Sequence, residues 1–114
     1  MSLELTDPSK SYELVHPSGA IFIMRHWTNA MQEEIDRRCI ISDGRGGLSY
    51  LSALEREIKI DLACQNWRGV TREGEEVLCN SETKKMLPPG AVLWIVKDVD
   101  ERAGIRMPDT EKKS

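Results

Sequence analysis

Short blocks of apolar residues alternate with polar stretches along this chain, and their periods predict strands and helices in turn. Two runs rich in β-branched and aromatic residues, 11–16 and 20–26, flank a proline, a serine and a glycine at 17–19. Because these three residue types favour turns, the arrangement predicts a β-hairpin. With serine and glycine at the tip, Ile21 is expected to pair with His16.

A helix is expected directly after this hairpin. Thr28 is a typical N-cap residue, because its hydroxyl can accept a hydrogen bond from a backbone N–H of the first turn. Apolar residues recur behind it every four positions, at Met31, Ile35 and Cys39. The helix should end before Ser42, and the glycine-rich segment at 43–47 should be a flexible loop.

The next segment, 48–65, fits two structures. Helical spacing relates Leu51, Leu54, Ile58 and Leu62. Strand alternation relates Ile58, Ile60, Leu62 and Cys64. Length favours a helix, because strands seldom exceed about ten residues, but whether residues 57–65 are helix or strand stays open at this point.

The remainder of the chain predicts a second hairpin, a short helical turn and a final helix. The hairpin covers 67–77, and Gly74 can adopt the left-handed backbone conformation at its turn. Asn80 is suited to cap the helical turn. Pro89 is suited to the first position of the final helix, and Gly104 to its C-terminal cap.

Together these elements indicate a small single domain of the α+β class, with two β-hairpins and about three α-helices. We place this domain at 11–104, with flexible polar segments at 1–10 and 105–114. A chain of 114 residues is long enough for one domain with its own hydrophobic core.

Composition and charge restrict the function classes. No run of about 18 apolar residues is present, and the first ten residues lack a basic region followed by an apolar stretch, so we expect neither a membrane span nor a signal peptide. The net charge of −3 is spread evenly, with 5 basic and 7 acidic residues in 1–50 and 11 and 12 in 51–114, so no basic half indicates nucleic-acid binding. An odd number of cysteines, three, favours free thiols over a disulfide framework and indicates a reduced, cytosolic protein.

Four acid–base pairs at i,i+4 spacing indicate helix faces in contact with solvent. They are Glu33 with Arg37, Glu34 with Arg38, Glu55 with Lys59, and Asp98 with Arg102. Each such pair contributes only a few tenths of a kcal/mol on an exposed helix face.

Residues able to carry chemistry do not gather into one predicted site. His16 and His26 would lie on the order of 16–17 Å apart along the predicted hairpin, too far to share a metal. The three cysteines lack Cys-x-x-Cys spacing, so we expect buried thiols and no zinc site. Glu73, Glu75 and Glu76 surround a turn, where a solvated loop is the simpler interpretation and a paired-carboxylate site the alternative. We therefore expect no cofactor, no metal and no catalysis, and a small enzyme using Glu73–Glu76 with a histidine is the least favoured hypothesis.

The final helix carries the surface that we expect to bind a partner. A helical wheel gives it one apolar face, formed by Val92, Ile95, Val96, Val99 and Ala103. Trp94 falls nearly opposite this face, beside Lys97, and Leu93 makes the first half of the helix apolar all round. Either Trp94 packs beneath the 67–77 hairpin or the N-terminal segment, or it belongs to an interface with a partner or a second copy of the chain. On the second interpretation, the partner-binding residues are Leu93, Trp94 and Lys97.

A tryptophan and two glycines mark the second predicted hairpin. We expect Trp67 to anchor the core, and Gly69 to let another backbone or ring approach closely. The surrounding pattern is Trp67-x-Gly69-Val70-x-x-x-Gly74-x-x-Val77, followed by Cys79-x-Ser81-Glu82. This pattern resembles the small phage tail assembly chaperones. The hairpin and helix expected between Leu14 and Cys39 are similar to the layout of that family.

The resemblance implies a role in binding and not in catalysis. Such chaperones are thought to bind the long apolar tape-measure protein of a phage tail and to keep it soluble while tube subunits assemble around it. For this chain the resemblance implies Trp67, Gly69 and Gly74 as scaffold residues, tape-measure protein or another tail protein as partner, and the bacterial cytoplasm as location. A structural tail completion or connector protein is the alternative.

Overall fold

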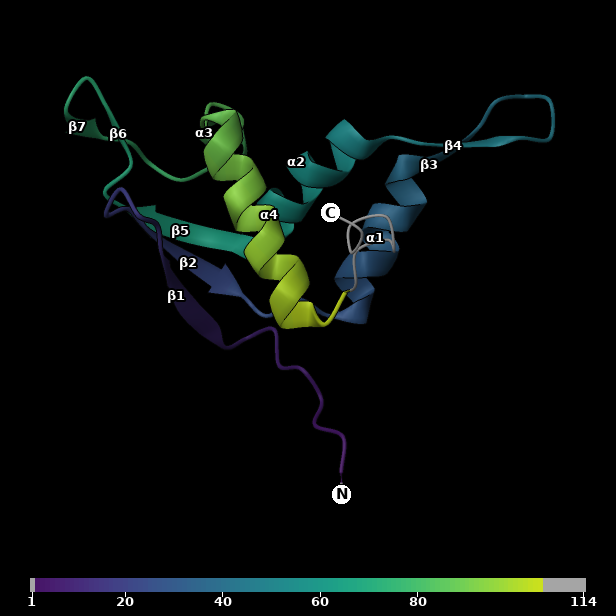
Figure 1. The fold of residues 1–114 in the computed structure, drawn as a ribbon, viewed down its shortest axis with the longest axis horizontal. Coiled ribbons are helices and arrows are strands. Elements are labelled where there is room, and N and C mark those ends of the chain that lie inside the picture. The colour runs from purple at the N-terminus through teal and green to yellow at the C-terminus, as the bar shows by residue number, and fades with distance from the viewer. Residues whose placement is uncertain (1, 106–114) are drawn as a thin grey trace, which may run out of the picture.

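A three-stranded antiparallel sheet is the largest sheet of the α+β fold that the computed structural model describes for residues 2–105 (Figure 1). Its strand order is β1-β2-β5, with β1 at Ser11–Val15, β2 at Ile21–Arg25 and β5 at Cys64–Arg68. The first two strands confirm the predicted N-terminal hairpin. The predicted register is wrong by one residue, because Ile21 pairs with Val15. The turn closes one position earlier than expected, with the Gly19 N–H donating to the His16 carbonyl at 2.8 Å.

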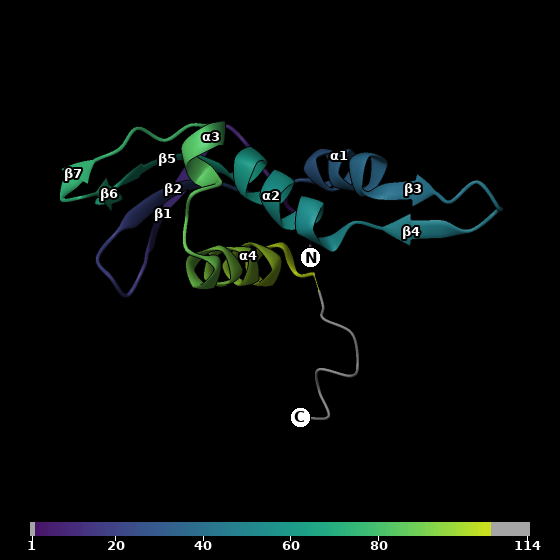
Figure 2. The same cartoon turned by 90° about the horizontal axis from the view of Figure 1, so that it is seen from above.

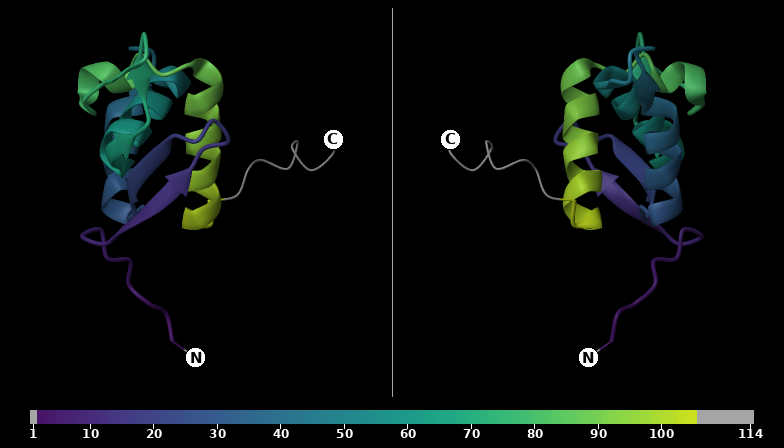
Figure 3. Two further views of the ribbon diagram at one scale, coloured as in Figure 1. Left: turned by 90° about the vertical axis from the view of Figure 1, so that its left-hand side faces the viewer. Right: turned by 90° about the vertical axis from the view of Figure 1, so that its right-hand side faces the viewer.

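The longest described helix, α4 (Pro89–Ala103), lies along one face of this sheet (Figures 1 and 3). Alternate residues of a strand point to the same face, so every second strand residue faces the helix. The buried residues of this main core from the sheet and α4 include Leu14, Phe22, Met24, Trp67, Ile95 and Val99. Within the predicted apolar face of α4, Ile95 and Val99 are fully buried, whereas Ala103 is exposed.

Helix α2 (Ser52–Ala63) lies between α1 (Asn29–Cys39) and α4. Ile58 packs with the α1 residues Ile35 and Cys39, whereas Ile60 belongs to the main core. A helix that is buried on two sides carries apolar residues at more positions than a surface helix does, which explains why the sequence of this segment also fitted a strand. The helix favoured by length is confirmed from Ser52 to Ala63, and β5 begins at the next residue.

Two hairpins extend from opposite ends of the molecule (Figures 1 and 2). One joins β3 (Ile40–Ser42) to β4 (Leu48–Tyr50). The sequence pattern did not predict these strands, and the helix favoured for 48–65 is wrong at Leu48–Tyr50. The other joins β6 (Thr71–Arg72) to β7 (Glu75–Glu76).

The second predicted hairpin is therefore shorter than expected. Its turn is confirmed, with left-handed φ angles of 52° at Glu73 and 84° at Gly74 as a two-residue turn between antiparallel strands requires. Its predicted start at Trp67 is wrong, because Trp67 lies on β5 and pairs with Phe22 of β2.

The expected helix ends are confirmed. The Thr28 hydroxyl accepts a hydrogen bond from the Met31 N–H at 3.3 Å, and Asn80 caps the short helix α3 (Ser81–Lys84). Pro89 is the first residue of α4, and Gly104 closes that helix with a φ of 74°.

The segments that flank the domain are described only in part. Ser2–Lys10 contains no helix or strand and is exposed, and of the predicted C-terminal segment only Ile105 lies within the described residues. None of the described helices combines the length and the apolarity that a membrane crossing requires.

Candidate functional site

Trp67 and Gly69 lie where β5 meets the second hairpin. The Trp67 ring is buried edge-to-face against Phe22, with 6.2 Å between ring centroids, and its Nε1 donates to the Val77 carbonyl at 2.8 Å. Gly69 has a φ of 77°, and a Cβ placed there would stand 3.4 Å from the Ala20 Cα. The tryptophan thus ties the sheet to the hairpin, and the glycine permits the turn that follows.

The acidic residues at the β6–β7 turn are exposed and do not converge on a second polar group. Glu76 accepts a hydrogen bond from the Gly69 N–H at 2.7 Å, so one of these carboxylates braces the backbone. Glu73 and Glu75 point into solvent at the surface. Within residues 2–105, no three His, Cys, Asp or Glu side chains gather in a way that could hold a metal ion.

The two histidines contact different aromatic rings. His16 lies edge-to-face against Trp94, with 4.8 Å between centroids, and its Nδ1 is 2.7 Å from the Ser18 hydroxyl. His26 stacks at a tilt on Tyr12 at 4.9 Å. Neither ring approaches the acidic turn through any contact of the described residues.

The predicted partner-binding residues share the outer side of α4 but differ in exposure. Leu93 is 57% exposed and Lys97 is exposed. Trp94 is half-buried, because one side of its ring packs against the main core and His16. The tryptophan thus packs against His16 of the N-terminal hairpin and presents part of its ring to solvent, and its place in an interface stays a prediction.

The β3–β4 hairpin presents a second apolar surface, which the sequence analysis missed. All six of its strand residues are exposed. We call it the apolar hairpin after its exposed large side chains and that of the residue following β4: Ile40, Ile41, Leu48, Tyr50 and Leu51. The signal was present in the sequence, since two short β-prone runs flank a five-residue loop with three glycines.

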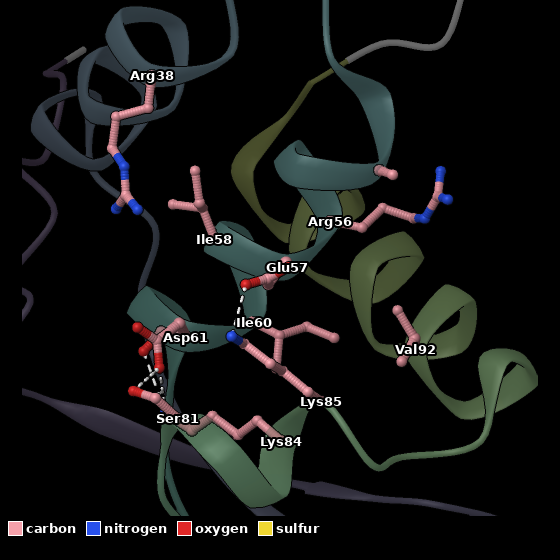
Figure 4. A pocket seen from close by; sticks show the side chains of 11 residues that line it. Arg38, Arg56, Glu57, Ile58, Ile60, Asp61, Ser81, Lys84, Lys85 and Val92 are labelled. Carbon is pink, nitrogen blue, oxygen red and sulfur yellow. Dashed lines mark hydrogen bonds and ion pairs between the residues drawn. The ribbon is translucent and has the colours of Figure 1, made fainter.

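A cleft of about 400 Å³ opens between α2 and α3 and reaches α1 and the start of α4 (Figure 4). We call it the basic cleft after its four cations, Arg38, Arg56, Lys84 and Lys85. Its apolar lining comes from Ala53, Ile58 and Ile60 of α2 and from Val92 of α4. The volume falls within the roughly 300–1,000 Å³ of ligand-binding pockets.

The charges of the basic cleft are only partly neutralised. Two carboxylates line it: Asp61 pairs with Lys84 at 3.3 Å, and Glu57 pairs with Lys85 at 3.3 Å. Four cations and two anions leave a net charge of +2 on a chain whose total is −3. Arg56 makes no ion pair with any residue in 2–105.

Asp61 is held in its charged form within this cleft. Burial alone would raise the pKa of its carboxyl group. Hydrogen bonds from the Ser81 hydroxyl at 2.8 Å and from the Lys84 ammonium at 3.3 Å outweigh that effect, so the pKa of Asp61 lies below its usual value. The Asp61 carboxylate thus holds Lys84 in place, and the nearby charge of Arg38 also favours the charged form of Asp61.

Lys59 corrects the expectation that the i,i+4 pairs lie in solvent. Its side chain is 2% exposed, and its Nζ lies 2.6 Å from Asp100 Oδ1 and 3.6 Å from Glu55. The ammonium also stands 5.7 Å from the centre of the Trp27 ring. This group links α2 to α4 and is structural.

The cysteines are free thiols within the fold. Cys39 and Cys64 are buried, and Cys79 packs at the edge of the main core. Burial raises the pKa of Cys64 to about 12, so this thiol is a poor nucleophile at neutral pH.

Comparisons of this chain with protein-family models, with curated proteins and with solved structures find no match. The surfaces of the described residues are therefore the basis for assigning a function. They are of two kinds: apolar surfaces on the β3–β4 hairpin and on α4, and the basic cleft between α2 and α3.

Proposed function

We propose that the protein is a phage tail assembly chaperone, which binds apolar stretches of tape-measure protein in the cytoplasm of the bacterial host. The proposal joins the resemblance carried by Trp67, Gly69 and Gly74 to the surfaces of the fold. The observation that carries it is the apolar hairpin, which extends from the body with every strand residue exposed (Figure 2).

Physical chemistry favours a partner on this hairpin. A two-stranded hairpin alone is at best marginally stable in water, and a group of exposed apolar side chains is typical of a surface that binds another protein. Here the hairpin is held at its base, where the Leu51 N–H donates to the Cys39 carbonyl at 2.9 Å. Its outer strand edges keep free backbone groups that an extended segment of a partner can pair with.

The outer side of α4 provides a second contact surface in this proposal. Leu93 and the exposed part of Trp94 supply apolar area, and Lys97 supplies charge at the rim. A long apolar partner such as a tape-measure protein can contact both surfaces along its length, because it offers many equivalent apolar segments.

Co-expression with fragments of tape-measure protein tests the proposal. The wild-type protein is expected to keep such fragments in the soluble fraction and to co-purify with them. The double variant Ile41→Lys/Leu48→Lys should lose both effects while its thermal unfolding stays close to wild type, since both side chains are exposed. Leu78→Lys is the control, because Leu78 is an exposed leucine in a different loop, with an exposed fraction of 83% against 74% for Leu48.

Leu93→Ser tests the contribution of α4 more cleanly than Trp94→Ser, because Trp94 also packs against the core. Equal retention of the fragments by the hairpin variant and by Leu78→Lys would refute the role of the hairpin. Presence of the protein in mature phage particles would instead favour a structural tail completion or connector protein. Placement of its gene between the tail tube and tape-measure genes would support either tail function.

A further inference from the structure

The N-terminal arm, Ser2–Thr6, carries the most exposed apolar side chains of the described chain. Leu3 is 94% exposed and Leu5 is 92% exposed, and the segment belongs to no helix or strand. The arm leaves the body and points away from it (Figure 3). Glu4 stands between the two leucines, so the arm combines apolar side chains with an anion.

The basic cleft complements the arm in both respects. In an extended segment, Leu3 and Leu5 point to one side about 7 Å apart and Glu4 points to the other. The apolar lining that the cleft presents comes mainly from exposed Ala53 and half-buried Val92, because Ile58 and Ile60 are only 2% and 3% exposed. Two lining arginines carry no strong ion pair: Arg38 lies 3.9 Å from the Glu34 carboxylate, and Arg56 forms no ion pair with any residue in 2–105. Leucines on the lining and a carboxylate beside one of the two arginines, which lie on opposite sides of the cleft (Figure 4), would satisfy both groups of side chains.

In the described conformation, the arm lies away from the cleft of its own chain (Figure 1). Thr6 and Ala103 line the same small cavity, so the arm starts beside the end of α4, whereas Val92 lines the basic cleft near the start of that helix. The helical rise over these 11 residues is about 16 Å. Leu3 lies three residues beyond Thr6 and reaches only about 10 Å from it.

We propose that the N-terminal arm of one copy binds in the basic cleft of a second copy. Because the arm and the cleft are different surfaces, the contact is heterologous, and each copy offers a free arm and a free cleft to the next. The association is therefore open-ended or closes into a ring. It is independent of the binding of tape-measure protein proposed above, which uses the apolar hairpin and α4.

Two complementary variants test this arrangement by analytical ultracentrifugation. The arm variant Leu3→Ser/Leu5→Ser keeps its cleft, and the cleft variant Arg38→Glu/Arg56→Glu keeps its arm. Wild-type protein should form species larger than a dimer as its concentration rises, and each variant alone should stay monomeric. A mixture of the two variants should form a 1:1 dimer and nothing larger, because one arm and one cleft remain.

A fluorescent peptide of residues 2–10 measures the same contact directly. It should bind the arm variant, and its affinity for the cleft variant or for Arg56→Glu alone should be lower by roughly tenfold or more. Arg45→Glu, the same charge reversal at the tip of the apolar hairpin, should leave the affinity unchanged. Circular dichroism establishes that each variant is folded.

Three results would overturn the proposal: continued association of the arm variant alone, a mixture that stays monomeric, or a peptide that binds no better to the arm variant than to the cleft variant. The first of these would point to a symmetric interface elsewhere on the chain. If the wild-type protein self-associates but does not bind tape-measure fragments, the proposed function is refuted and the arm–cleft contact stands.

Discussion

The buried ion pair between Lys59 and Asp100 should contribute far more to stability than a surface pair of the same length. Its Nζ–Oδ1 distance is 2.6 Å, with the lysine side chain 2% and the aspartate side chain 15% exposed. Asp100→Asn removes the charge of one partner and preserves its size and helix propensity. The lysine ammonium then stays buried with Glu55, at 3.6 Å, as its remaining ion-pair partner.

Removing one partner of a buried ion pair costs about 3–5 kcal/mol, because the other charge is left without compensation in a poorly solvated site. Glu55 retains part of that compensation, so we expect a loss at the low end, about 3 kcal/mol. For a domain of this size, that loss lowers the melting temperature by roughly 10 °C or more.

Equilibrium unfolding in urea, followed by circular dichroism, measures this loss. The matched control is Glu13→Gln, which breaks an ion pair with Arg68 that is also 2.6 Å long but has side chains 56% and 59% exposed. A surface pair of this kind is worth up to about 1 kcal/mol. Because the two ion pairs have the same length, the difference between the two losses of stability reports the effect of burial.

Equal losses for Asp100→Asn and Glu13→Gln would refute the argument that burial strengthens the first pair. A second test replaces both partners with apolar residues, Lys59→Met/Asp100→Leu. This double variant should recover most of the stability lost in the single one, since the fully buried ammonium is gone and Glu55, 28% exposed, still contacts water.

Three further predictions concern single groups. Gly69→Ala should destabilise the fold by about 1–2 kcal/mol, because the φ of 77° at this position disfavours a side chain. Gly90→Ala should stabilise the fold by roughly 0.5 kcal/mol, because Gly90 lies in α4 and a Cβ there would meet no atom within 4 Å. Chemical denaturation measures both changes. At pH 8, a thiol reagent should label half-buried Cys79 well before Cys64, whose pKa burial raises to about 12, and equal labelling rates in folded protein would contradict the burial of Cys64. Burial, followed by the charge of a neighbouring carboxylate, raises the pKa of Tyr12 to about 12, so the folded state keeps a proton that the unfolded state releases above a pH of about 10. The free energy of unfolding should therefore fall as the pH rises from 10 toward 12, and Tyr12→Phe should lessen that fall.

Features that depend on neighbouring residues could be predicted from the sequence. The cap at Thr28, the start of α4 at Pro89 and its end at Gly104 each follow from the chemistry of one residue and the helix turn beside it. The turn at Gly74 is of the same kind. These contacts span only a few residues, so the rest of the fold hardly changes them.

Features that depend on distant segments could not be predicted in this way. Trp67 pairs with a strand more than 40 residues earlier in the chain, and no local pattern identifies that partner. Lys59 follows Glu55 at the spacing of a surface pair, yet the packing of α4 over α2 buries it. The basic cleft likewise brings together residues from four helices or their ends, and only the tertiary fold places Arg38 near Asp61.

The two ends of the described domain meet, because Thr6 and Ala103 line one cavity and the Tyr12 hydroxyl donates to Asp98 at 3.3 Å. A short glycine linker could join these ends, and the chain could be opened instead in the exposed loop at 43–47. Such a circular permutant would lack a free N-terminal arm. It would also reverse the order of synthesis across the sheet. β5 would leave the ribosome before β1 and β2, so the sheet could form only after the N-terminal hairpin had been synthesised.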